Sequence, residues 1–132
     1  DFLFFGFDKP KEKIENVEFK PIIGEALQYI KNSRGVITLA GHTTISEALV
    51  FRKPLLSFPI PNHIEQEYNG YILRKNKLGT VKELQTWSKE QYLIECINEF
   101  LQVRAEIKKN LIKADFRGDG AKQAAKIISK SL

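Results

Sequence analysis

Cysteine, histidine and long apolar runs are all scarce in this chain of 132 residues. The single cysteine, Cys96, excludes an internal disulfide and a zinc site built from several cysteines. His42 and His63 are far apart in sequence and no third ligand is evident, so the sequence predicts no metal site. No apolar run approaches the length that spans a bilayer, and no signal-peptide pattern is present.

Two common phosphate-binding fingerprints are missing as well. The chain has no G-x-G-x-x-G, which excludes the usual dinucleotide-binding loop, and no glycine-rich loop ending in Lys-Ser or Lys-Thr, which excludes a P-loop. Internal repeats and low-complexity linkers are also absent. The sequence therefore predicts a single domain over residues 1–132, with no cofactor.

Charge is unevenly distributed along the chain. The formal net charge is +5, and the basic excess falls late, between Lys108 and Lys130. Two interpretations of this stretch stay open: a solvated helix face, or a basic surface that meets an anionic membrane. The stretch lacks the repeated aromatic residues on which single-stranded nucleic acids stack, so we expect no nucleic-acid partner.

Strand and helix patterns alternate along the first two-thirds of the sequence. Continuous apolar runs predict strands at 2–7, 16–19, 35–40 and 53–59, with a short edge strand in 79–84. Amphipathic runs predict helices at 43–51, 63–76 and 121–129. Two more are predicted from their start signals, one that Pro21 opens and one that follows a Ser88–Gln91 capping box. This alternation indicates an α/β fold, a Rossmann-like parallel sheet flanked by helices, in which 2–7, 35–40 and 54–58 are neighbouring strands.

Ligands bind such sheets at the carboxyl ends of the strands, where two loops stand out. The first loop begins at Gly41 and opens a helix, whose free N–H groups favour a phosphate, with Thr43 and Thr44 adding hydroxyls. Glu47, one turn into the helix, could accept hydrogen bonds from two adjacent hydroxyls, as on a ribose. The alternative needs no ligand, because Thr44-Ile45-Ser46-Glu47 also matches a capping box.

The second loop leads into a helix that carries Glu65, Gln66 and Asn69 near its start. An acid beside an amide can bracket sugar hydroxyls, since each side chain offers two polar atoms in one plane. The other interpretation is that these are ordinary surface residues of a helix, with His63 as a helix-capping or surface histidine.

The order and spacing of these elements over roughly residues 17–80 resemble the nucleotide-sugar half of glycosyltransferases with the two-domain GT-B fold. The similarity is greatest to the group that contains the peptidoglycan N-acetylglucosaminyltransferase and the plant UDP-glycosyltransferases. The shared frame is a strand, then G-x-x-[ST]-x-x-E, then a strand that ends in proline, then [DE]-Q-x-x-N. Its residues here are Gly41, Thr44, Glu47, Lys53, Pro54, Pro59, Glu65, Gln66 and Asn69.

The resemblance implies a UDP-sugar donor site and transfer of a hexosyl or N-acetylhexosaminyl group without a metal ion. The implied contacts are Gly41, His42, Thr43 and Thr44 with the diphosphate, Glu47 with the ribose, Glu65 and Gln66 with the donor sugar, and Phe19 and Lys20 with the uracil. In plant members a histidine stands two residues before the glycine, whereas this chain has Leu39 there and a histidine at His42.

The resemblance also implies that this chain is the C-terminal donor half of a longer protein and begins near the second strand of that half. We therefore expect the acceptor site and the general base to lie on a missing N-terminal domain, and the chain alone to be inactive. A sheet without its first strand predicts self-association, most simply a homodimer. The expected location is the cytoplasm, including the inner face of the membrane. Two alternatives remain: a non-catalytic donor-binding subunit of a split glycosyltransferase, and an enzyme like UDP-N-acetylglucosamine 2-epimerase.

Overall fold

The computed structural model describes residues 1–6, 13–21, 26–84, 90–114 and 116–131. Its strands are β1 (Phe2–Phe5), β2 (Val17–Lys20), β3 (Val36–Thr38), β4 (Leu55–Ser57) and β5 (Gly79–Val81). Its helices are α1 (Ala26–Asn32), α2 (His42–Val50), α3 (Ile64–Lys75), α4 (Glu90–Lys113) and α5 (Gly120–Ser131). Every strand pair within these ranges is parallel, which confirms the predicted α/β class.

The larger sheet has the strand order β3-β4-β5. Leu55 of β4 pairs with Val36 on one side and with Gly79 on the other, so β4 is central and β5 lies at an edge, as predicted. All three residues of β4 are fully buried. Burial on both faces is what a parallel strand covered by helices requires, and it explains the unbroken apolar pattern there.

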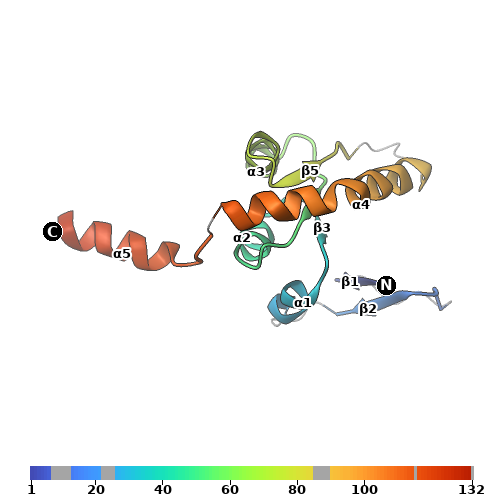
Figure 1. The fold of residues 1–132 in the computed structure, drawn as a ribbon, viewed down its shortest axis with the longest axis horizontal. Helices are drawn as coiled ribbons and strands as arrows, with labels where there is room; N and C mark the ends of the chain where they lie inside the picture. The colour runs from blue at the N-terminus through green and yellow to red at the C-terminus, as the bar shows by residue number, and fades with distance from the viewer. Residues whose placement is uncertain (7–12, 22–25, 85–89, 115, 132) are drawn as a thin grey trace.

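The predicted adjacency of strands 2–7 and 35–40 is wrong. β1 pairs with β2 in a separate two-stranded sheet, where Phe2 lies opposite Val17. The Phe4 and Phe19 rings stack between these strands with centroids 5.5 Å apart, and this contact favours the β1–β2 pairing. Figure 1 shows the two strands lying together, apart from β3 and β5. Among the described residues, β1 and β3 therefore each keep one edge without a backbone partner.

Helix α4 supplies much of the core under the larger sheet. It buries Cys96, Phe100, Ile107 and Leu111, so Cys96 is a free thiol in the core. A Cβ added to Gly35, just before β3, would lie 3.0 Å from Cζ of Phe100. That distance shows how closely α4 packs against the start of β3. The predicted capping box of this helix includes Ser88, which lies outside the described residues, as do residues 22–25 before α1.

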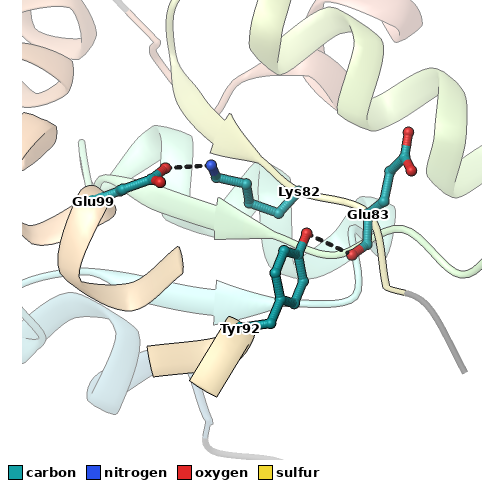
Figure 2. Close-up of polar contacts among 4 residues, drawn as sticks. All are labelled: Lys82, Glu83, Tyr92 and Glu99. Atoms are coloured by element: carbon teal, nitrogen blue, oxygen red, sulfur yellow. Dashed lines mark hydrogen bonds and ion pairs between the residues drawn. The ribbon is translucent and has the colours of Figure 1, made fainter. Parts of the chain in front are cut away.

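Two polar contacts fix α4 to the chain that follows β5 (Figure 2). Lys82 forms an ion pair with Glu99, and the Tyr92 hydroxyl donates a hydrogen bond to the Glu83 carbonyl at 3.0 Å. The hydrogen bond that Lys82 donates to Glu99 raises the pKa of Lys82 above its ordinary value. The side chains of this pair remain 27% and 59% exposed, so the ion pair orients the helix more than it stabilises the fold.

Helix α5 projects away from the remaining elements in Figure 1. Its described residues are exposed, including Ile127 at 67% and Ile128 at 61%. The prediction of a last helix at 121–129 is confirmed with slightly wider bounds. In the described part of the chain, no helix combines the length and the apolar character needed to cross a membrane.

Candidate functional site

The N-terminus of α2 lies directly after β3 and has no side-chain cap. Gly41 is the N-cap residue, with φ −64° and ψ 137°, and its carbonyl accepts the first helical hydrogen bond, from Ile45 N at 3.1 Å. A Cβ built on Gly41 would meet none of its non-adjacent neighbours within 4 Å. The space beside Gly41 is therefore open. The N–H groups of the first turn, from His42 to Thr44, are those that a helix leaves without internal partners, and an anion can bind them.

The capping-box interpretation of Thr44 and Glu47 is wrong. The helix begins at His42, so Thr44 is its third residue and not its N-cap. Glu47 consequently lies in the second turn, half-buried. Within the described ranges its carboxylate has no hydrogen-bond or ion-pair partner, so the oxygens stay available to a ligand.

Asn69 of α3 holds the backbone that leads into this helix. Its Nδ2 donates a hydrogen bond to the carbonyl of Ala40 at 3.0 Å. Ala40 is fully buried and has a φ of +65°, in the left-handed region that costs a residue with a side chain roughly 1 kcal/mol or more. Asn69 thus fixes a strained turn just before Gly41. Sequence reasoning placed Asn69 in the family frame but missed this role, because nothing in the sequence indicates a positive φ at an alanine.

The second loop is held by the first turn of α3. Oε1 of Gln66 accepts a hydrogen bond from Ile60 N at 2.9 Å, and Oε1 of Glu67 accepts one from Asn62 N at 2.9 Å. Gln66 thereby keeps its amide N–H groups free to donate, while Glu65 is exposed and has no partner among the described residues. His63 is the N-cap residue, as one interpretation expected, but its side chain makes no capping bond.

The two loops meet, as their positions after adjacent parallel strands predict. The Asn69–Ala40 hydrogen bond joins them directly. Gly70 allows α3 to pack closely on the second loop and on β5, since a Cβ there would lie 2.9 Å from Cγ of Pro59 and 3.1 Å from Cγ1 of Val81. The residues that were predicted to contact the diphosphate, the ribose and the donor sugar therefore lie at the carboxyl end of the larger sheet.

The predicted uracil contacts are not part of this cluster. Phe19 and Lys20 end β2, in the other sheet, where Phe19 is engaged by Phe4. Nζ of Lys20 lies 2.5 Å from Oε1 of Glu18, and the hydrogen bond between them raises the pKa of Lys20. No contact given for the described residues joins either side chain to Gly41, so their role stays a prediction.

A cavity of about 710 Å³ lies between α2, α3 and the end of α4. Of the predicted site residues only His42 borders it, beside Ser46 and Asn69. His42 Nε2 lies 3.5 Å from Ser46 Oγ, which is too long for a strong hydrogen bond. Its other walls combine apolar side chains, such as Leu49 and Ile72, with polar ones, such as Asn110 and Lys113.

Comparison with known proteins decides the family. The profile of glycosyl transferase family 1 matches residues 1–103. The chain belongs to this family. An uncharacterized glycosyltransferase of Methanosarcina mazei is 34% identical over 125 residues, which is 92% of this chain and 32% of that protein. One from Methanopyrus kandleri is 34% identical over 110 residues, covering 83% of this chain and 30% of that protein.

Solved structures show the same fold. The glycotransferase of kitacinnamycin matches 96% of this glycosyl transferase family 1 chain with a TM-score of 0.65 and 17% identity. The spinosyn forosaminyltransferase SpnP matches 96% of it with a TM-score of 0.63 and 17% identity. The expected GT-B C-terminal domain is thereby confirmed. The chain spans about a third of the length of each of these proteins.

Proposed function

We propose that this chain is the donor-binding part of a glycosyltransferase that uses a UDP-sugar. Family membership supports glycosyl transfer in general. The observation that carries the donor assignment is the α2 N-terminus. The uncapped helix start at Gly41 lies one to two turns from the Glu47 carboxylate, which has no partner among the described residues. Phosphate donors and a hydroxyl acceptor at that spacing suit the diphosphate and ribose of a nucleotide.

In this proposal the helix start binds the diphosphate through the N–H groups of His42, Thr43 and Thr44, with the two threonine hydroxyls close by. When the bond between the donor sugar and the diphosphate breaks, negative charge grows on the leaving diphosphate. Preformed N–H donors and the positive end of the helix dipole stabilise that charge, which is the task that a divalent ion performs in other glycosyltransferases.

Glu47 accepts hydrogen bonds from both ribose hydroxyls. A carboxylate would repel the diphosphate if it stood in the first turn. Its position in the second turn separates the charges by about one helical pitch, roughly 5.4 Å. That separation allows one short helix to bind both parts of the nucleotide.

Glu65 and Gln66 hold the donor sugar. The free Glu65 carboxylate accepts from sugar hydroxyls, and Gln66 donates through its amide while its oxygen stays bonded to Ile60 N. The acceptor and the general base are then provided outside this chain, on an N-terminal domain of the same protein. The split form, with a separate acceptor subunit, is the second arrangement. The names of the relatives favour transfer over epimerisation.

The test is calorimetry on the full-length protein with UDP, dTDP, GDP and ADP. We expect UDP to bind at least tenfold more tightly than the two purine diphosphates. Equal affinity for UDP and ADP would overturn the uridine assignment, and no binding of any of the four would overturn the diphosphate site. Mass spectrometry of the products of a UDP-sugar with candidate acceptors distinguishes transfer from epimerisation, which leaves the mass of the donor unchanged.

A further inference from the structure

A second cavity lies at the amino ends of β3 and β4, which is the end of the larger sheet opposite to Gly41 and Pro59. Its volume is about 270 Å³, room for about nine water molecules at roughly 30 Å³ each. It lies where the chain enters β3 and β4, under the middle of α4. The residues that line it are Ser33, Arg34, Lys53, Pro54, Arg104, Ala105 and Lys108.

All four charged residues of this cavity are cations, and they come from three separate segments. Arg34 precedes β3, Lys53 precedes β4, and Arg104 and Lys108 lie one turn apart on α4. No acidic side chain lines the cavity in the part of the chain that the structure describes. Four like charges around so small a space repel one another, and a bound anion removes that repulsion. We call these four residues the basic pocket.

Two of the four cations are fixed in place by the backbone. Lys53 Nζ donates to the carbonyl of Ser33 at 2.8 Å, and Lys108 Nζ donates to the carbonyl of Arg52 at 2.7 Å. Each ammonium group has three protons, so each keeps donors for a ligand. Burial lowers the pKa of Lys53, and the nearby charge of Lys108 lowers it further. The second of these effects reflects the repulsion between two cations that lie close together.

The two arginines have no such anchor. Among the described residues neither Arg34 nor Arg104 has a hydrogen-bond or ion-pair partner. A guanidinium group presents paired N–H donors that match two oxygens of a phosphate, whereas an ammonium group acts as a point charge. Two free arginines beside two anchored lysines therefore suit a phosphate group better than a single carboxylate.

We infer that the basic pocket binds a phosphate group, at a site separate from the α2 N-terminus and independent of the proposed donor site. The phosphate belongs either to a soluble phosphorylated molecule or to the headgroup of an anionic lipid. Both sources present the same oxygens to the pocket, and they are separated by experiment.

The test uses the full-length protein and the variant Arg104→Gln, because the Arg104 side chain has no hydrogen bond or ion pair in the part of the chain that the structure describes. Lys109→Gln is the matched control, since Lys109 is exposed on the same helix and does not line the cavity. Inorganic phosphate is titrated by calorimetry. Sedimentation with phosphatidylcholine vesicles, with and without phosphatidic acid, tests the lipid source. Melting curves confirm that both variants fold.

We expect Arg104→Gln to weaken phosphate binding about tenfold, which is the effect of losing one charge-assisted hydrogen bond. We expect Lys109→Gln to bind phosphate as the wild type does, and both variants to keep the wild-type affinity for UDP. Phosphate binding without sedimentation indicates a soluble ligand. Sedimentation with phosphatidic acid that Arg104→Gln abolishes indicates a lipid headgroup. If neither probe binds, or if the two variants behave alike, the inference is overturned. Because UDP binding is measured on the same samples, failure here is distinguishable from failure of the donor site.

Discussion

Glu47→Gln replaces the proposed ribose acceptor with the smallest change in size. Because Gly41 is the N-cap residue and Thr44 lies inside the helix, Glu47 is not a partner in a capping box whose loss would weaken α2. Glutamine and glutamate have nearly the same helix propensity. The carboxylate has no partner within the described residues, so no tertiary contact is lost. The free energy of unfolding should therefore change by less than about 0.5 kcal/mol.

The expected loss in UDP binding is much larger. Each hydrogen bond from a ribose hydroxyl to an ionised carboxylate contributes about 1.5–3 kcal/mol. An amide keeps one acceptor oxygen without the charge and turns the other acceptor into a donor that faces a hydroxyl. Losing roughly 1.4–2.8 kcal/mol corresponds to binding that is about tenfold to a hundredfold weaker.

Calorimetry of UDP with the full-length protein measures this effect, with Glu106→Gln as the control. Glu106 is exposed on α4, so that variant loses the same charge away from the site. Titration with 2′-deoxy-UDP adds a second comparison, because removing one hydroxyl should weaken binding to the wild type more than to Glu47→Gln. Equal UDP affinity of the wild type and Glu47→Gln would refute the ribose assignment.

Four further outcomes are expected. Asn69→Ala removes the bond to the carbonyl before Gly41; denaturant titration should show a loss of about 1 kcal/mol, and calorimetry weaker UDP binding. Gly70→Ala should cost about 1 kcal/mol net, since its Cβ would lie 2.9 Å from a proline ring atom, whereas Gly120→Ala, in open space, should be neutral. Glu99→Gln should cost less than about 1 kcal/mol. Because Glu99 raises the pKa of Lys82 above 10.5, that difference persists below pH 10.5 and vanishes at higher pH, which melting curves can follow. The 132-residue chain alone should dimerise through its free strand edges, and light scattering that shows only monomers would contradict this.

Strand β4 could be predicted from the sequence because it lies in a continuous apolar run that is buried on both faces. Helix α3 was predicted within one residue at each end, and β4 within the longer run that surrounds it. The predicted strand 35–40 is longer than β3, because Ala40 turns into the left-handed region and the chain leaves the sheet. Apolar runs identify strands but do not say which strands pair. For that reason the position of β1 beside β2 was missed.

The candidate site was predictable only in part, for a related reason. The spacing of Gly41, Glu47, Gln66 and Asn69 indicated which residues gather at the carboxyl end of the sheet. It did not indicate the positive φ at Ala40 just before Gly41, or that Gln66 and Asn69 bind backbone atoms of the loops. The basic pocket gave no sequence signal at all, since its four cations are separated by long stretches and meet only in the fold.

The two proposed anion sites, at the N-terminus of α2 and in the basic pocket, differ in the charge of the groups that bind the anion. Helix α2 contains no lysine or arginine, so the proposed diphosphate site relies on neutral N–H groups and the helix dipole. A cation on that helix would pair with the Glu47 carboxylate and occupy the acceptor that the ribose needs. The basic pocket has no carboxylate to protect, so it can use four full charges. Neutral donors at one end of the sheet and cations at the other would therefore leave Glu47 available to the ribose while the proposed second phosphate binds at the opposite end of the same sheet.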